Sequence, residues 1–189
     1  MAIKPLNADR VSAYADTMRP YMERATPADM ESGASWYADA REIAVTVAER
    51  MSVSVETGAA IIAALSPRMP WTRNVTLALD MADGKPVRAL GQSVRAAERA
   101  VSLYRDGLDP LEALGGPKTN AFARNIAGDM DAVTVDVWMC RAAGLDSDAP
   151  TVVQYREISA ATAVLAREYG MSPAAAQACI WTAVRGSAD

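Results

Sequence analysis

The sequence predicts an all-α fold, built as a two-lobed helical domain. Apolar residues recur at the three- and four-residue spacing of amphipathic helices, and no run alternates with the period of two that a half-buried strand requires. Alanine, the best helix former, is abundant. Half of the 189 residues are hydrophobic, which is enough to bury a sizeable core.

Start and stop signals divide the chain into helices joined by short turns. Ser54 has the position of an N-cap before a run, 58–65, that is apolar on all sides and is therefore expected at the centre of the core. Gly33 is expected to interrupt one helix, and Ser93 to cap another. The expected helices cover, in order, about 7–22, 26–32, 36–51, 54–65, 71–82, 93–104, 110–114, 117–127, 136–143, 151–169 and 172–181.

Charge and residue types narrow the functional classes. The net charge is −4 and the pI about 5.0, which is the wrong sign for a protein held to nucleic acid by bulk electrostatics. DNA binding would therefore need a local basic patch. The chain has no histidine and only two cysteines, which excludes an ordinary zinc site and a four-cysteine iron–sulfur cluster. No metal or other cofactor is predicted, and acid–base chemistry falls to Asp, Glu, Lys or Tyr.

The apolar segments of the chain predict burial in a core, without a bilayer span. None reaches the roughly 18 residues that a transmembrane helix needs, so no membrane partner and a cytoplasmic location are expected. Both cysteines, Cys140 and Cys179, lie in apolar helical stretches, where small buried thiols are expected.

The stretch from 111 to 144 is the most informative for function. It contains a short helix, the turn Gly115-Gly116, and a second helix that begins at Pro117. Such a turn exposes backbone N–H groups at the positive end of a helix, where a phosphate binds without much net charge. Lys118 in the first turn adds a cation or a nucleophile, and Asp136 supplies a carboxylate at the start of the next helix.

This stretch resembles the helix-hairpin-helix DNA glycosylases, the superfamily of endonuclease III. Members carry a hairpin of the form LPGVGxKTA and then a VDTHVxR segment with a catalytic aspartate. Here Gly116-Pro117-Lys118-Thr119 matches the GxKT portion, and Val135 to Arg141 matches VDTHVxR. Lys118 and Asp136 are separated by 18 residues, as in the lyase-competent members.

The chain also departs from the family pattern. The hairpin turn is shorter, Trp138 replaces the usual histidine, and the C-terminal iron–sulfur cysteines are absent. Together with the acidic pI, these departures argue against ordinary duplex repair. A narrower resemblance is to small glycosylase-like proteins encoded by phages, some of whose relatives accompany base-modification systems. The location would then be the host cytoplasm.

The resemblance implies chemistry at the glycosidic bond of a base removed from the stack. Asp136 would stabilise positive charge on the sugar, and Lys118 would attack the sugar carbon to give a Schiff base. Each residue also has a purely structural interpretation. Asp136 has the residue type of an N-cap, and Lys118 is equally a phosphate contact or a solvated surface lysine.

A second candidate surface runs from Ser66 to Asn74. Three side chains there, Arg68, Trp71 and Arg73, are candidate DNA contacts, because in the resembled fold this loop fills the gap left by a flipped base. The alternative is that Trp71 packs into the core and both arginines are solvated. The candidate DNA-binding residues of the hairpin are Gly115, Gly116 and Thr119, and the candidate pocket residues are Ser66, Asn74 and Trp138.

The resemblance predicts one glycosylase-like domain over 1–189 with a helix-hairpin-helix motif and a cleft between its lobes. The central lobe would span about 53–131 and the second lobe 1–52 with 132–189, so that Lys118 and Asp136 face each other across the cleft. The leading function is DNA glycosylase-like chemistry with DNA as partner. The alternatives are a non-catalytic helix-hairpin-helix DNA-binding module and a phage protein that binds a host protein.

Overall fold

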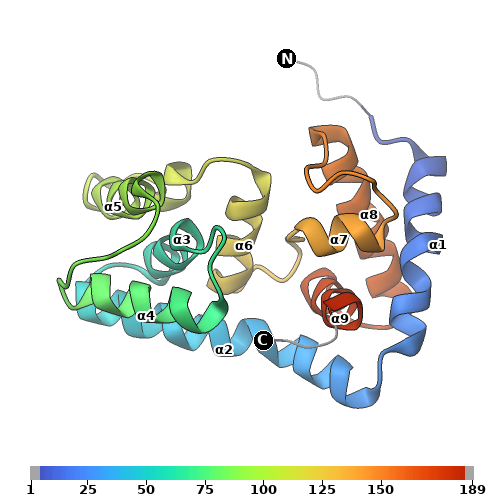
Figure 1. Ribbon diagram of the computed structural model, residues 1–189, viewed down its shortest axis with the longest axis horizontal. Helices are drawn as coiled ribbons and strands as arrows, with labels where there is room; N and C mark the ends of the chain where they lie inside the picture. The colour runs from blue at the N-terminus through green and yellow to red at the C-terminus, as the bar shows by residue number, and fades with distance from the viewer. Residues whose placement is uncertain (1–4, 186–189) are drawn as a thin grey trace. The chain divides into compact units, whose positions relative to one another are not determined.

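The computed structural model describes residues 5–185, and all regular structure in that range is helical (Figure 1). The all-α prediction is confirmed, since no strand occurs among these residues. The elements are α1 (Ala8–Arg24), α2 (Pro27–Met51), α3 (Val55–Leu65), α4 (Trp71–Ala82), α5 (Gly91–Arg105), the 3-10 helix η1 (Pro110–Ala113), α6 (Pro117–Ala127), α7 (Val137–Ala142), α8 (Val152–Glu168) and α9 (Pro173–Arg185).

Packing groups the described residues into two compact units. The central unit is the continuous segment Tyr37–Asp129, and the terminal unit combines the residues up to Trp36 with those from Met130 onward. Helix α2 contributes its first part to the terminal unit and the remainder to the central unit. No described helix is both long and apolar enough to cross a membrane.

Helix α3 forms the core of the central unit. Its residues from Thr57 to Leu65 are all buried, as the apolar run predicts, and α4, α5, η1 and α6 pack around it (Figure 1). Gly58 brings the backbones of α3 and α2 into contact, because a Cβ at this position would lie 2.3 Å from the carbonyl oxygen of Ala44. Any larger residue at position 58 would force the two helices apart.

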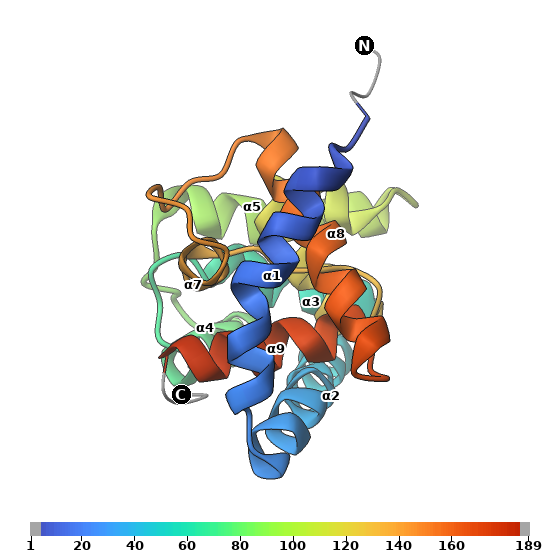
Figure 2. The same ribbon diagram turned by 90° about the vertical axis from the view of Figure 1, so that its right-hand side faces the viewer.

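The terminal unit is built on α1, α8 and α9, with the short α7 packed against α9. Figure 2 shows α1 running beside α8. The fully buried carboxylate of Glu157 in α8 ties the two helices together. Its Oε1 accepts hydrogen bonds from Arg10 Nη2 at 2.8 Å and from the backbone N–H of Asn7 at 3.2 Å. The start of α1 is thus held by a side chain 150 residues away.

Two local predictions are wrong. Gly33 does not interrupt a helix, because α2 runs without a break from Pro27 to Met51. A single glycine lowers helix stability by only about 1 kcal/mol, which the rest of a long helix offsets. Ser93 is not an N-cap, since α5 begins two residues earlier after Leu90 and Ser93 is buried inside it.

The other capping signals are confirmed. Ser54 caps α3 by accepting a hydrogen bond from the Thr57 N–H. Thr151 and Gln154 form a reciprocal capping box at the start of α8. Helix α6 begins at Pro117 and ends at Gly128, which has a left-handed φ of 108°. Cys140 and Cys179 are both buried, as expected.

Candidate functional site

The carboxylate of Asp136 in the terminal unit is held by three N–H donors. Its Oδ1 accepts hydrogen bonds from the backbone N–H groups of Trp138 and Met139, each at 3.0 Å, so Asp136 is the N-cap of α7. Its Oδ2 accepts a 2.9 Å hydrogen bond from the indole Nε1 of Trp181 in α9. The structural interpretation of Asp136 is therefore correct, and the fixed, half-buried anion is also what catalysis at a sugar would need.

The segment that leads into Asp136 is buried, and Tyr155 binds its backbone. The Tyr155 hydroxyl donates to the Val133 carbonyl at 2.8 Å and accepts from the Val135 N–H at 3.3 Å. Burial, together with the nearby charge of Asp136, raises the pKa of Tyr155 to about 12, although its hydrogen bond from Val135 opposes the shift. The neutral phenol fixes this backbone one residue before the carboxylate.

Two arginines lie over the tryptophans that contact Asp136. The guanidinium carbon of Arg141 is 4.7 Å from the ring centroid of Trp138, and that of Arg185 is 4.7 Å from the ring centroid of Trp181. Both tryptophans are half-buried, and both arginines are exposed. Cation–π contact of this kind restricts the orientation of each ring.

The predicted hairpin lies in the central unit and is open to solvent. Gly116 is the N-cap of α6 with φ 86° and ψ 154°, a conformation that only glycine adopts readily. Neither Gly115 nor Gly116 has any atom within 4 Å of the place where a Cβ would stand. No side-chain hydrogen bond caps α6, and a phosphate-binding turn would likewise need the first N–H groups after Pro117 to be without a side-chain cap.

Lys118 and Thr119 occupy the first turn of α6, with Lys118 exposed and Thr119 half-buried. Within residues 5–185 the Lys118 amine makes no ion pair or hydrogen bond. The turn is connected to η1 by a long hydrogen bond, which Asn120 Nδ2 donates to the Leu111 carbonyl at 3.5 Å. At the far end of α6, Arg41 Nε donates to the Ala127 carbonyl at 3.2 Å.

The second candidate surface lies at the start of α4. The Trp71 ring meets Phe122 of α6 edge to face with centroids 6.4 Å apart, so this surface packs on the helix that the hairpin opens. Arg68 and Arg73 are both exposed, and Arg68 has a left-handed φ of 59°. The Ser66 hydroxyl donates to the Ala63 carbonyl at 2.9 Å and ends α3.

Asn74, the other predicted pocket residue of this segment, is 1% exposed. Neither its Oδ1 nor its Nδ2 has a hydrogen-bond partner among the described residues. Native proteins rarely leave a buried carboxamide unpaired, and such groups commonly meet a water or a ligand. This is a structural signal for Asn74 that helical periodicity alone does not give.

Sequence reasoning missed two residues that build the Asp136 site. Tyr155 and Trp181 lie 20 and 45 residues from the backbone and side chain that they hold. No local pattern marks a contact over such a separation. The one available signal is chemical, because a tryptophan placed on a partly buried helix face usually finds an acceptor for its N–H.

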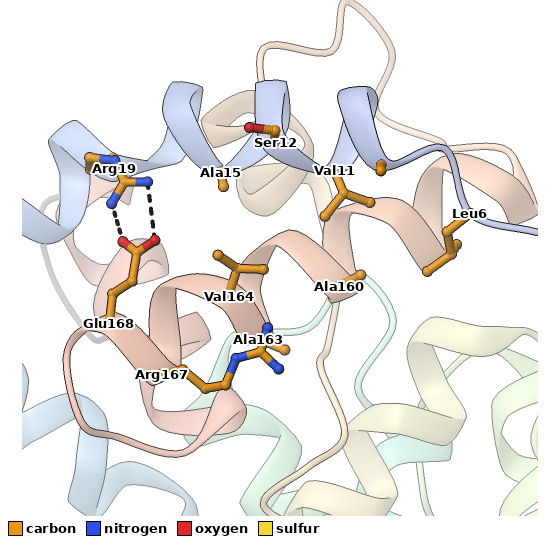
Figure 3. Close-up of a pocket in the computed structure, with 11 residues that line it drawn as sticks. Leu6, Val11, Ser12, Ala15, Arg19, Ala160, Ala163, Val164, Arg167 and Glu168 are labelled. Carbon is orange, nitrogen blue, oxygen red and sulfur yellow. Dashed lines mark hydrogen bonds and ion pairs between the residues drawn. The ribbon is translucent and has the colours of Figure 1, made fainter.

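A separate hollow of about 540 Å³ lies between α1 and α8 in the terminal unit (Figure 3). Alkyl side chains such as Val11 and Val164 line it, and an ion pair between Arg19 and Glu168 closes one end. None of the predicted site residues lines this hollow. Within residues 5–185, no three Cys, Asp or Glu side chains gather as metal ligands would.

Comparison with known proteins shows the family of this chain. The model of a family of unknown function, DUF7178, matches residues 2–188, so the chain belongs to that family. No curated protein and no solved structure matches the chain. Because the family description carries no activity, a function has to be argued from the residues themselves.

Proposed function

We propose that this member of a family of unknown function acts on the glycosidic bond of a flipped or modified DNA base. The observation that carries the proposal is the carboxylate of Asp136, which three N–H donors from two helices hold in one orientation. The motif resemblance supports the same conclusion, because Asp136 follows the hairpin lysine at the spacing of lyase-competent glycosylases.

The chemistry follows from charge that develops on the sugar. As the base departs with the bonding electron pair, the sugar ring becomes positively charged, and a fixed carboxylate stabilises that charge more than it stabilises the neutral substrate. The unprotonated amine of Lys118 attacks the sugar C1′. The C1′–O4′ bond then breaks as the nitrogen lone pair forms the C=N bond, one amine proton passes to O4′, the other is lost to water, and an imine results.

DNA would be held by backbone groups, which explains how an acidic protein binds a polyanion. The turn from Gly115 to Thr119 offers N–H groups at the head of α6, and Arg68 and Arg73 add exposed positive charge in the same unit. A net charge of −4 then matters less than this local distribution. The unpaired carboxamide of Asn74 supports its assignment as a candidate pocket residue.

Borohydride trapping tests the covalent step directly. The full-length protein is incubated with a 5′-labelled duplex that carries one abasic site, then reduced. We expect a covalent adduct that Lys118→Ala abolishes and Asp136→Asn reduces by about 100-fold. Arg124→Ala serves as a surface control, since Arg124 lies at the far end of α6 in an ion pair with Asp129.

Base excision is followed in parallel on a panel of oligonucleotides, each with one damaged or modified base, by mass spectrometry of the released base. Release of a base without an adduct would leave Asp136 catalytic and assign water as the nucleophile in place of Lys118. If none of the oligonucleotides gives a released base or a covalent adduct, the proposed chemistry is contradicted.

The second candidate function is a non-catalytic helix-hairpin-helix DNA-binding module. Its specific support is that the Asp136 hydrogen bonds also satisfy a purely structural N-cap. Binding of an unmodified duplex with steep salt dependence, without adduct or excision, would favour it. An absence of DNA binding at low salt would contradict both candidates and favour a protein partner.

A further inference from the structure

The two oxygens of the Asp136 carboxylate are held by different parts of the terminal unit. Oδ1 is bound by the first backbone N–H groups of α7, which follow directly in the chain. Oδ2 is bound by the Trp181 side chain, which belongs to α9. Because the carboxylate is planar, rotation about the Cβ–Cγ bond moves both oxygens together, and the Trp181 contact adds a second restraint, from another helix, to the rotation that the cap already limits.

The Trp181 ring is itself restrained. The Arg185 guanidinium stacks on it from one turn further along α9, and α9 packs against α7. An indole is a donor only, so its N–H has one role, and here that N–H points to Asp136 at 2.9 Å. A rigid donor on a packed helix loses little conformational entropy when it holds an anion.

We propose that Trp181 is a positioning residue for the Asp136 carboxylate and acts through its indole N–H. The inference rests on the proposed function, in which a negative charge must face a developing cationic sugar. With the N–H in place, the plane of the carboxylate is set before substrate binds, and no reorganisation is needed during the reaction. Without it, one restraint on the rotation of the carboxylate is lost, its orientation varies more, and the same charge stabilises the transition state less.

The first experiment tests the contact without any substrate. The protein is labelled with 15N-tryptophan, which gives one indole signal for each of its four tryptophans, and Trp181→Phe identifies the Trp181 signal. We expect this signal to lie downfield and to move upfield in Asp136→Asn, because a charged acceptor becomes a neutral one. Trp36→Phe, the matched control, should leave the Trp181 signal in place. A Trp181 signal that ignores Asp136→Asn would overturn the inference.

The second experiment separates an N–H role from a packing role. Single-turnover rates of adduct formation or base release are measured at saturating protein for Trp181→Phe and Trp181→Leu, beside the DNA dissociation constants. We expect both variants to react at least about tenfold more slowly with unchanged DNA affinity, because both lose the N–H although phenylalanine keeps a packed ring. Circular dichroism melting confirms that each variant is folded at the assay temperature.

The outcomes distinguish this inference from the function on which it rests. If Trp181→Phe reacts at the wild-type rate while Trp181→Leu is slow, the ring acts by packing and the positioning role is overturned. If the wild-type protein neither forms the adduct nor releases a base, the proposed function falls and the positioning role falls with it. The positioning role would be established if the indole signal shifts in Asp136→Asn and if Trp181→Phe reacts slowly while it binds DNA with unchanged affinity.

Discussion

The Asp136 region and the hairpin use polar groups in opposite ways. Around Asp136, both carboxylate oxygens and the backbone before them are bound by protein groups, including the distant Tyr155 and Trp181. At the hairpin, the first N–H groups of α6 are uncapped and Lys118 is exposed. In one candidate site the protein already binds the polar groups, whereas in the other the first N–H groups of the helix have no side-chain cap. Substitutions in both regions and a change of pH test this difference.

Removal of the carboxylate should have the largest effect on stability. Asp136→Ala leaves two backbone N–H groups of α7 and the Trp181 indole without their acceptor, and we expect the free energy of unfolding to fall by about 3 kcal/mol. Urea titration measures it. Asp136→Asn retains one acceptor oxygen and should lose about half as much. An equal loss in both variants would mean that the charge, and not the number of hydrogen bonds, holds this site.

The second largest effect should come from alkaline pH, which is expected to lower the free energy of unfolding through Tyr155. Folding holds the pKa of Tyr155 at about 12, above the ordinary value of 10.0, so the neutral phenol is favoured in the folded state. Its contribution to stability is complete below about pH 10 and is lost as the pH rises toward 12, by at most about 3 kcal/mol. Tyr155→Phe should flatten the stability profile within this window. The buried Cys179, whose pKa is raised to about 11, affects both proteins alike.

Substitution of the two neighbouring glycines of the hairpin should have an intermediate effect on the free energy of unfolding, and the two glycines serve as a matched pair. Gly116→Ala places a Cβ on a residue with φ 86° and should destabilise the central unit by about 2 kcal/mol. Gly115→Ala, beside it and equally free of neighbours, should change the free energy of unfolding by less than about 0.5 kcal/mol. Thermal melting compares the two. Equal losses would show that the turn is constrained by more than the Gly116 backbone.

Substitution of Asn74 should have the smallest effect on stability, and it should raise the free energy of unfolding, whereas the changes described before lower it. Asn74→Leu replaces a buried, unpaired carboxamide by an apolar side chain and should raise the free energy of unfolding by about 1 kcal/mol. Base excision, measured as above, should fall in the same variant. A stabilised variant that keeps full activity would remove Asn74 from the candidate pocket.

How much of this could be predicted depends on the range of each interaction. Three predictions depend only on residues that are neighbours in the sequence, and all three are confirmed. They are the apolar run of α3, the start of α6 at Pro117 and the capping box at Thr151. The break expected at Gly33 was wrong because a local preference was outweighed by a long helix. The contacts of Tyr155 and Trp181 bridge distant segments, so their existence depends on tertiary packing that periodicity does not report.

The split composition of the terminal unit has a consequence for synthesis. The central unit is one uninterrupted stretch and is able to collapse around α3 while later residues are still being translated. The terminal unit is completed later in synthesis. The start of α1 is held by Glu157 of α8, and the Asp136 carboxylate is held by Trp181 of α9. A ribosome-stalled nascent chain that ends within α8 should therefore carry a protease-resistant central unit and an incomplete carboxylate site. Both oxygens of the Asp136 carboxylate are therefore bound only after α9 has also been synthesised.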